Sequence, residues 1–490
     1  MRITRPLLVT ALLSCAALVA SCAKNPVTGN TDITTVSKKG EIEQGRKAHE
    51  QVIRFYGIYE DQGLQDYVTQ IGTKLAQASE RPELEWHFTV VDADDINAFA
   101  LPGGYIYITR GIMAYLNSEA ELAAVLGHEI GHVTARHSVR QQSQNLLTGI
   151  LATGAAIFTG SRAVADLANI GGQALLRGYG RDMELEADRL GAQYLAKTGY
   201  DPQAMIGVIG VLKNQETFEI QRAREEGREP RVYHGVFASH PSADDRLQQA
   251  VGLAKPAKTG TTPRVAVEDY MAQLQGVSFM SSKQQGIVRD NRFYHAGLGI
   301  TVAFPKDWVV LNQRNRLLAH TRTQDAVIQV TTDARPENLT PRDYLQKQLG
   351  QRSLTAGQDF NFNDMEGYSL VARSGSPLDG GKGPVRYAAV YRDKLVFIFA
   401  ASSRSSQESI PAHDRVFLST FQTLRSLKPS EFPLAEPYRI DLVKAQNGTK
   451  MEDLAKDSPI KKYPLQTLRL INDLYPNKQP EAGRIVKVVD

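Results

Sequence analysis

The stretch Gly127-His128-Glu129-Ile130-Gly131-His132 decides how this 490-residue chain is interpreted. Two histidines four residues apart on a helix project from one face, so both imidazoles can bind one metal ion. A carboxylate from elsewhere would complete a three-ligand zinc site with a fourth position open for water. Glu129 lies where its carboxylate can take a proton from that water. The stretch therefore predicts one Zn²⁺ per chain, with His128 and His132 as ligands and Glu129 as catalytic residue.

The residues around this stretch predict a helix from Asn117 to about Arg140. Ser118 followed by Glu121 is the signature of a capping box at its start. An apolar face follows, formed by Leu122, Val125 and Leu126. The alternative, a surface helix with incidental histidines, leaves both the cap and this face unexplained.

His137 is the next imidazole along the chain, but its position argues against a role as third ligand. On a continuous helix, at about 100° per residue, it would point to the side opposite His128. The metzincin pattern is also excluded, because it requires a glycine at 135 and a histidine at 138, where this chain has Ala135 and Ser138. The third ligand is therefore expected from another helix.

A helix expected near Asp182–Lys197 offers several carboxylates. Glu184 lies at the edge of its apolar stripe, whereas Glu186 is turned roughly 160° away. A carboxylate beside a buried face is costly unless it binds a metal or a partner. Asp188, one turn after Glu184, could accept the second N–H of a ligating histidine and fix its tautomer. The other interpretation is a charged helix in solvent, which fits Glu186 better than Glu184.

These motifs resemble those of the zinc metallopeptidase family that includes the CAAX prenyl protease, HtpX and BepA. The resemblance covers about residues 41–252 and implies that Glu184 is the third zinc ligand, within a soluble core of helices around a small sheet. The chain lacks the transmembrane helices of HtpX and the CAAX protease and the C-terminal TPR array of BepA, so the partners of those proteins do not carry over. The matching segments are Asn97–Gly104, Arg110-Gly111, Glu121–Ala123, His128–His132, Glu184–Asp188, and His240-Pro241 with Arg246.

His240 completes the resemblance and has three interpretations. It can be a plain loop histidine near the start of a helix. It can occupy the open zinc position, which would keep the enzyme latent until substrate displaces it. Alternatively, His240 or Arg246 can donate a hydrogen bond to the oxyanion that forms during attack. We favour latency, because an unregulated protease facing nascent envelope proteins would be hazardous.

The side chains from Tyr105 to Thr109 alternate in type along the chain, as is typical of an edge strand. A substrate could add to such a strand as a further extended strand, bonded through backbone groups. Tyr105, Ile106 and Tyr107 are therefore expected to bind substrate. The alternative is an interior strand.

The N-terminal residues predict a lipoprotein signal. A short positive region precedes the apolar run Leu7–Ala20, which is too short to span a bilayer, and small residues precede Cys22. We expect lipid attachment at Cys22, with an ordinary signal peptide as the alternative. Ala23, rather than Asp, favours an anchor in the outer membrane facing the periplasm. Cys15 would leave with the signal, which excludes disulfides and thiolate zinc sites.

The composition is that of a folded protein, with 42% hydrophobic residues and 57 basic against 53 acidic residues. This balance gives no electrostatic reason to expect nucleic acid as a partner. The predicted fold class is α+β: a mainly helical metallopeptidase core with a small sheet, a separate α+β domain, and a βααβ segment that resembles a LysM module. The predicted divisions are a signal peptide at 1–21, a tether at 22–40, the peptidase domain at 41–252, a linker at 253–263, a domain of unknown role at 264–430, and the LysM-like module at 437–490.

The sequence thus predicts a zinc-dependent endopeptidase of the bacterial cell envelope, with unfolded or misassembled envelope proteins as substrates. Two other functions stay open at this point. One is an assembly chaperone or scaffold with little proteolysis. The other is a cell-wall protein that contacts peptidoglycan through residues 437–490. Leu146 to Phe158, the most apolar internal run, is expected to form a buried or site-covering helix.

Overall fold

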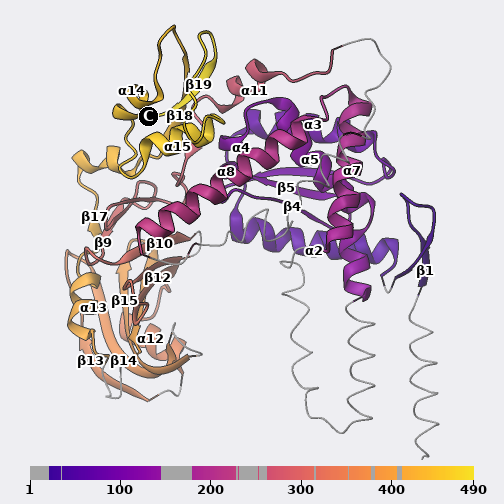
Figure 1. Ribbon diagram of the computed structural model, residues 1–490. Helices are drawn as coiled ribbons and strands as arrows, with labels where there is room; N and C mark the ends of the chain where they lie inside the picture. The colour runs from indigo at the N-terminus through magenta and orange to yellow at the C-terminus, as the bar shows by residue number, and fades with distance from the viewer. Residues whose placement is uncertain are drawn as a thin grey trace, which may run out of the picture. The chain divides into compact units, whose positions relative to one another are not determined.

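The computed structural model describes residues 21–34, 36–144, 179–227, 230, 252, 262–313, 316–350, 353–376, 381–404 and 411–490 (Figure 1). The chain forms two compact units. Unit 1 comprises Met1–Phe279 together with Arg439–Asp490, and unit 2 comprises Met280–Tyr438. Both contain helices and sheets, as expected from the mixed class predicted above. Among the described residues, no helix is both long enough and apolar enough to cross a membrane.

Unit 1 is built on a three-stranded sheet in the order β3-β5-β4, with β3 at His87–Val91, β4 at Ala98–Leu101 and β5 at Tyr105–Thr109. β5 pairs in parallel with β3 and antiparallel with β4. The expectation that Tyr105–Thr109 is an edge strand is therefore wrong: its backbone groups are used on both sides. β4 lies at one edge of the sheet. In the part of the chain that the structure describes, it pairs only with β5, so its other side is open.

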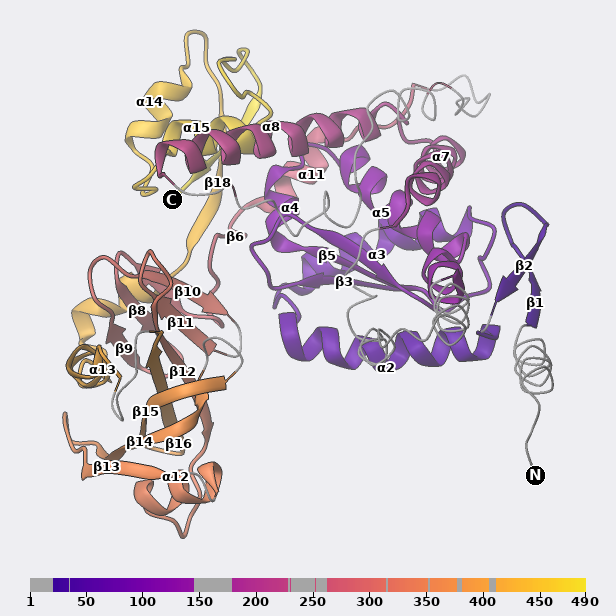
Figure 2. The ribbon, with the colours of Figure 1, turned by 60° about the horizontal axis from the view of Figure 1, so that its bottom comes forward.

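Helices cover both faces of this sheet (Figure 2). α2 (Lys38–Tyr56) lies on one face, where its apolar side chains pack against Leu101 and Tyr107. α3 (Gln62–Gln77) lies on the other face, so close that Gly72 faces the ring of Phe88. α5 (Glu119–Thr134) packs beside α3 and β4. Around them lie α4 (Arg110–Tyr115), α7 (Arg181–Thr198) and α8 (Ala204–Glu225).

The start of α5 is fixed by its cap. Ser118 Oγ accepts a hydrogen bond from the Glu121 backbone N–H at 3.2 Å, and the Glu121 carboxylate accepts one from the Asn117 N–H at 2.6 Å. The capping signature predicted from the sequence thus places the helix start correctly. The helix ends at Thr134, several residues before the predicted end, and Arg136 beyond it has a φ of 57°.

A buried carboxylate joins α2 to the end of α5. Glu41 binds Arg81 at 2.7 Å and Arg136 at 2.8 Å, and all three side chains are almost completely buried. Arg81 also donates to the Val133 carbonyl at 3.0 Å. These contacts hold the last turn of α5, in which His132 lies.

α5 and α7 cross at unusually close range. A Cβ on Gly131 would lie 3.0 Å from both Cα and O of Ala187, and a Cβ on Gly191 would lie 3.0 Å from the His128 backbone nitrogen. Glycine at both positions removes the side chains that would otherwise separate the two backbones. The first turn of α7 is thereby brought against the face of α5 that carries the histidines.

The C-terminal segment has the strand-helix-helix-strand order expected from the sequence. β18 (Tyr438–Lys444), α14 (Met451–Lys456), α15 (Pro464–Ile471) and β19 (Ile485–Val489) follow one another, and the sheet order is β19-β18-β6, with β6 at Ser278–Phe279. Lys487 of β19 is fully buried, and its Nζ donates to the carbonyls of Ala114 and Leu116 at 2.9 and 2.6 Å. The segment is thus part of unit 1. Its proposed likeness to LysM in glycan binding stays a prediction.

The compact units also divide the chain at a different point from the predicted start at residue 264. α11 (Val267–Leu274) belongs to unit 1, where Tyr270 donates to the Met113 carbonyl at 2.7 Å. Arg264 binds Glu119 at the start of α5 at 2.7 Å. These long-range contacts hold residues 264–279 in unit 1. The predicted linker lies outside the described residues except at 262 and 263.

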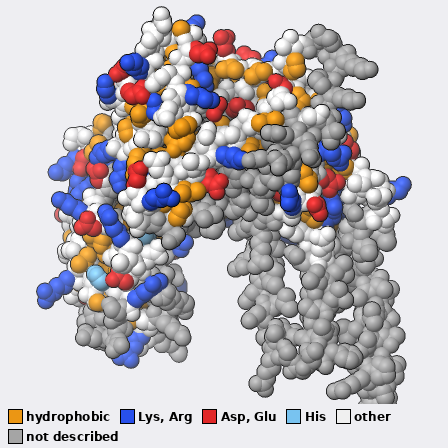
Figure 3. All heavy atoms as spheres, in the orientation of Figure 1, with side chains coloured by type: hydrophobic (Ala, Val, Ile, Leu, Met, Phe, Trp, Pro, Cys, Tyr) orange, Lys and Arg blue, Asp and Glu red, His pale blue; other side chains and the backbone are white. Residues whose placement is uncertain are grey.

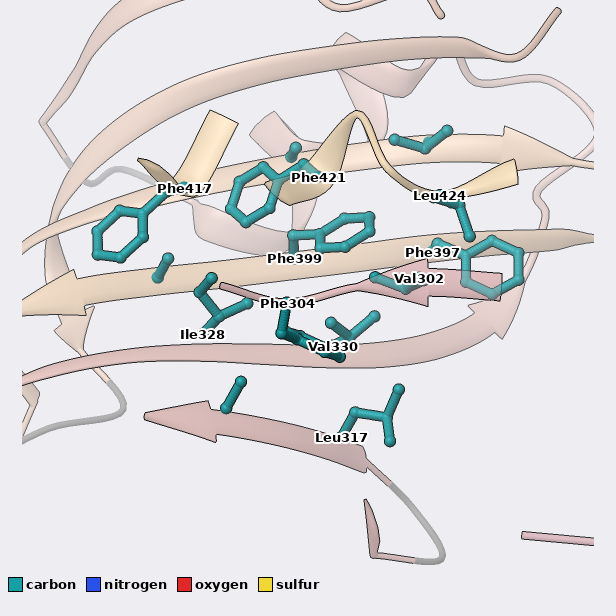
Figure 4. Packing of buried hydrophobic residues seen from close by; sticks show 14 of the residues in the cluster. Val302, Phe304, Leu317, Ile328, Val330, Phe397, Phe399, Phe417, Phe421 and Leu424 are labelled. Atoms are coloured by element: carbon teal, nitrogen blue, oxygen red, sulfur yellow. The ribbon is translucent and has the colours of Figure 1, made fainter. Parts of the chain in front are cut away.

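Unit 2 contains a seven-stranded antiparallel sheet and a four-stranded sheet, in the orders β10-β11-β12-β16-β15-β14-β13 and β17-β9-β8-β7. Phe399 of β16 (Leu395–Ser403) and Phe421 of α13 (Asp414–Phe421) pack in the hydrophobic core of unit 2, with their ring centroids 4.6 Å apart (Figure 4). The strands are β7 (Ile287–Arg289), β8 (Arg292–His295), β9 (Ile300–Ala303), β10 (Val309–Gln313), β11 (Arg316–His320), β12 (Ala326–Ala334), β13 (Leu354–Asp359), β14 (Glu366–Ser376), β15 (Gly381–Arg392), β16 (Leu395–Ser403) and β17 (Arg425–Ser426). The helices are α12 (Pro341–Leu349), α13 (Asp414–Phe421) and the 3₁₀ helix η3 (Pro429–Ala435).

Two further strands, β1 (Ser21–Lys24) and β2 (Thr31–Thr34), form an antiparallel pair before α2. The backbone of Cys22 lies in β1, opposite Ile33. Acidic and basic side chains are interspersed over the described part of the surface in view (Figure 3).

Candidate metal centre

The structure brings together the three side chains predicted as metal ligands. His128 and His132 of α5 place their Nε2 atoms 3.0 Å apart, and the Glu184 carboxylate of α7 lies 3.6 Å from each of them. Donor atoms bound at about 2.0–2.1 Å to one tetrahedral zinc ion lie roughly 3.3–3.4 Å from one another. Two imidazole nitrogens and one carboxylate at these separations therefore fit a single zinc ion.

Asp188 fixes the orientation of His128. Its Oδ1 lies 2.9 Å from His128 Nδ1, and a carboxylate can only accept, so Nδ1 carries the proton. Nε2 is then the nitrogen that faces Glu184 and that can bind a metal ion. Burial lowers the pKa of His128, but the hydrogen bond and charge of Asp188 and the charge of Glu184 outweigh it and raise that pKa to about 9. The same carboxylates that favour a proton there favour a metal cation in its place.

Glu129 is 2% exposed and follows His128 on α5. Its charge acts on His128 and on Tyr179: burial, followed by the charges of Glu129 and Glu184, raises the pKa of the Tyr179 hydroxyl. The Glu129 carboxylate is thus buried near the ligands and close enough to act on their charge. Tyr179, which the sequence analysis did not single out, stacks on His132 with ring centroids 4.2 Å apart.

His137 and Glu186 have positions that the sequence analysis did not predict. His137 Nδ1 lies 2.7 Å from His132 Nδ1, and its Nε2 lies 3.1 Å from a Glu186 oxygen. The expectation that His137 points away from the site is wrong, because α5 ends at Thr134 and a turn at 135–136, with a φ of 57° at Arg136, interrupts the helix before His137. The preference for a solvent-facing Glu186 is also wrong: its hydrogen bond with His137 lowers the pKa of its carboxyl to about 2, with a further contribution from Arg140.

A cavity borders His132, one of the three predicted ligands, on the side of β4. Ala100 and Leu101 of β4 line it together with His132 and Tyr179. Because the Thr109 N–H bonds to Asn97 O, strand alternation directs the backbone groups of Ala100 away from β5. The open edge of the sheet therefore borders the site.

The three residues of β5 that were predicted to bind substrate are not brought together with the ligands. Ile106 and Tyr107 lie in the central strand, and the Tyr107 hydroxyl is 2.7 Å from His49 Nδ1, on the face that α2 covers. Tyr105 stacks on His87, with ring centroids 4.5 Å apart. His240, Arg246 and the run Leu146–Phe158 lie outside the described residues.

Comparison with known proteins gives the family of this domain. The model of peptidase family M48 matches residues 63–254. The chain is 30% identical over 255 residues to the beta-barrel assembly-enhancing protease of Yersinia pestis, covering 50% of each protein, and 28% identical over 275 residues to the protein of that name in Escherichia coli K12, covering 54% of each. It is 35% identical over 175 residues to the mitochondrial metalloendopeptidase OMA1 of Arabidopsis thaliana, covering 34% of this chain and 35% of that protein. The chain thus spans about half the length of the bacterial relatives. Residues 63–254, which contain the three predicted ligands and Glu129, thus match the model of a peptidase family M48 domain.

Proposed function

We propose that this protein is a zinc-dependent endopeptidase of the bacterial cell envelope that degrades misfolded or unassembled envelope proteins. The observation that carries the proposal is the convergence of His128, His132 and Glu184 at separations that fit one zinc ion. Glu129 follows His128 directly on α5 and is buried. An inactive scaffold would have no need of this set, since buried carboxylates and imidazoles are costly unless they are paired or bind a metal.

The residues of the site have distinct roles in this proposal. A zinc ion bound there would lower the pKa of a water molecule toward about 7 and polarise the scissile carbonyl. Glu129 takes the proton of that water and returns it to the leaving amine. Asp188 holds the imidazole of His128 in the tautomer that presents Nε2 to the ion.

We further propose that the substrate chain binds along β4 rather than β5. Ala100 lies at the open edge of the sheet and lines the cavity beside His132. An extended peptide can bond there through its backbone. Because the bonds are made by backbone groups, binding of this kind depends little on the substrate's sequence, which suits unfolded protein segments. Replacing Ala100 with proline removes the outward N–H, and it should raise KM for an unfolded substrate while zinc content is unchanged.

The envelope location rests on the relatives and on the N-terminal sequence. The bacterial relatives are named for enhancing β-barrel assembly, and we propose that this chain acts on proteins of the same compartment. A lipid at Cys22 would anchor it to the outer membrane, facing the periplasm. Labelling with radioactive palmitate tests the anchor: wild type should take up label and Cys22→Ser should not. Equal labelling of both would place the lipid elsewhere.

Digestion of casein tests the proposed activity. Wild type should cleave casein and lose this activity to a chelator, and Glu129→Gln should remain bound to substrate without cleaving it. Mass spectrometry of envelope proteins captured by Glu129→Gln would then identify the substrates. A chaperone or scaffold role makes a different prediction, because it does not need the general base: wild type and Glu129→Gln would then support envelope assembly equally well.

A further inference from the structure

We propose that His137 and Glu186 form a relay that positions His132 for the metal ion. The proposal rests on the proposed function, because it assigns a role toward the same zinc site. It adds two positioning residues that do not touch the ion. The sequence analysis assigned neither residue a role, because His137 was expected to face away from the site and Glu186 to face solvent.

The hydrogen-bond directions in the relay follow from its far end. The Glu186 carboxylate can only accept, so His137 donates from Nε2 across 3.1 Å. A neutral His137 then has a lone pair on Nδ1, which lies 2.7 Å from His132 Nδ1. His132 must therefore carry its proton on Nδ1 and donate it to His137. Its Nε2 is left with a lone pair directed at His128 Nε2 and Glu184, where the ion would bind.

The far end of the relay is itself held in place. Arg140 donates from Nη1 to the same Glu186 oxygen across 2.7 Å. His137 is completely buried, and the Tyr179 ring stacks on His132 at an interplanar angle of 19°. Burial and stacking restrict both imidazole rings to one orientation. The relay thus ends in an ion pair rather than in a mobile side chain.

The two metal-binding histidines obtain their orientation in different ways from one helix. Asp188 of α7 contacts His128 directly, at 2.9 Å. Glu186, two residues earlier, lies on another face of α7 and reaches His132 only through His137. α7 therefore supplies the carboxylate ligand Glu184 and both orienting carboxylates. Partners of this kind typically change metal affinity or activity 10–100-fold when they are removed.

Zinc affinity, measured by competition with a chromophoric chelator, tests the relay without relying on activity. His137→Phe keeps the ring volume but removes the acceptor, and it should raise the zinc Kd about 10–100-fold. His137→Asn places an amide oxygen near the position of Nδ1 and should recover part of this loss. Glu186→Ala should weaken zinc binding, whereas Asp182→Ala, an exposed acid in the same helix, should leave it unchanged.

Two outcomes would overturn the relay. One is a zinc Kd within twofold of wild type in folded His137→Phe and Glu186→Ala proteins. The other is His137→Asn binding zinc as weakly as His137→Phe, which would show that ring packing rather than the hydrogen bond matters. Absorption spectra of Co²⁺-loaded proteins give a second readout, since the relay predicts altered bands in His137→Phe but not in Asp182→Ala. Failure of the proposed function would look different, because His132→Ala would then bind zinc as wild type does.

Discussion

The close crossing of α5 and α7 predicts that a single methyl group at Gly131 disturbs the metal site. In Gly131→Ala the new Cβ would lie 3.0 Å from both Cα and O of Ala187. This is closer than almost all real Cβ contacts, so the two helices must separate by a few tenths of an ångström. Neither clashing atom belongs to a flexible side chain that could move aside. The separation falls between His132 on one helix and Glu184 on the other.

The size of the effect follows from this displacement. Metal-ligand distances are held to about ±0.2 Å, so a helix displacement of this size already strains the site. Overpacking of this kind costs about 1–3 kcal/mol. If zinc binding has to restore the original crossing, the zinc Kd of Gly131→Ala rises about 5- to 150-fold.

Chelator competition on Gly131→Ala and Gly210→Ala measures the effect against a matched control. Gly210 also lies inside a helix, α8, but a Cβ there meets nothing within 4 Å. The control should keep wild-type zinc affinity and gain up to about 1 kcal/mol in the free energy of unfolding. Wild-type zinc affinity in Gly131→Ala would refute the reasoning, because the crossing would then not position Glu184.

Three further predictions concern stability. Glu41→Gln leaves Arg81 and Arg136 buried without a counter-charge, and urea unfolding should show a loss of about 3–5 kcal/mol. Burial lowers the pKa of Lys487 to about 7 from its ordinary 10.5. Between about pH 7 and 10 the Lys487 amine is protonated in the unfolded state but mostly neutral in the folded state. The free energy of unfolding of wild type should therefore rise with pH over this range, and Lys487→Met should not show this rise. Lys487→Met also leaves two buried carbonyls unsatisfied, at about 1–3 kcal/mol each. Zinc at 1,000 times its Kd should stabilise wild type by about 4 kcal/mol, and a chelator should lower its Tm but leave that of Glu184→Ala unchanged.

Local sequence signals predicted the parts of unit 1 that depend on neighbouring residues. The cap at Ser118 fixed the start of α5, and the four-residue spacing of His128 and His132 placed both imidazoles on one face. Helical periodicity also separated Glu184 from Glu186 correctly as faces of α7. These features follow from the geometry of a single helix, which the sequence carries directly.

Features that depend on where the chain goes after a helix ends, or on contacts between distant residues, could not be predicted from local sequence patterns. The position of His137 was extrapolated along α5, but the helix ends at Thr134, and Arg136 has a positive φ without the glycine or asparagine that commonly marks such an end. The central place of β5 was missed because β4 is short and lacks an alternating pattern. The buried contact of Lys487 with α4 joins residues more than 370 positions apart, and no local pattern encodes it.

The central claim is that the protein is a zinc-dependent endopeptidase in which Glu129 is the general base. Glu129→Gln tests it most directly, because this change should largely abolish turnover without affecting zinc binding. The measurement is zinc content and the rate of casein cleavage on the same preparations of wild type and Glu129→Gln. We predict about one zinc ion per chain in both proteins and a fall in rate of about 10²–10⁴-fold in the variant, the usual contribution of a general base. Cleavage by Glu129→Gln at the wild-type rate, or wild-type protein that cleaves casein without zinc, would contradict the account.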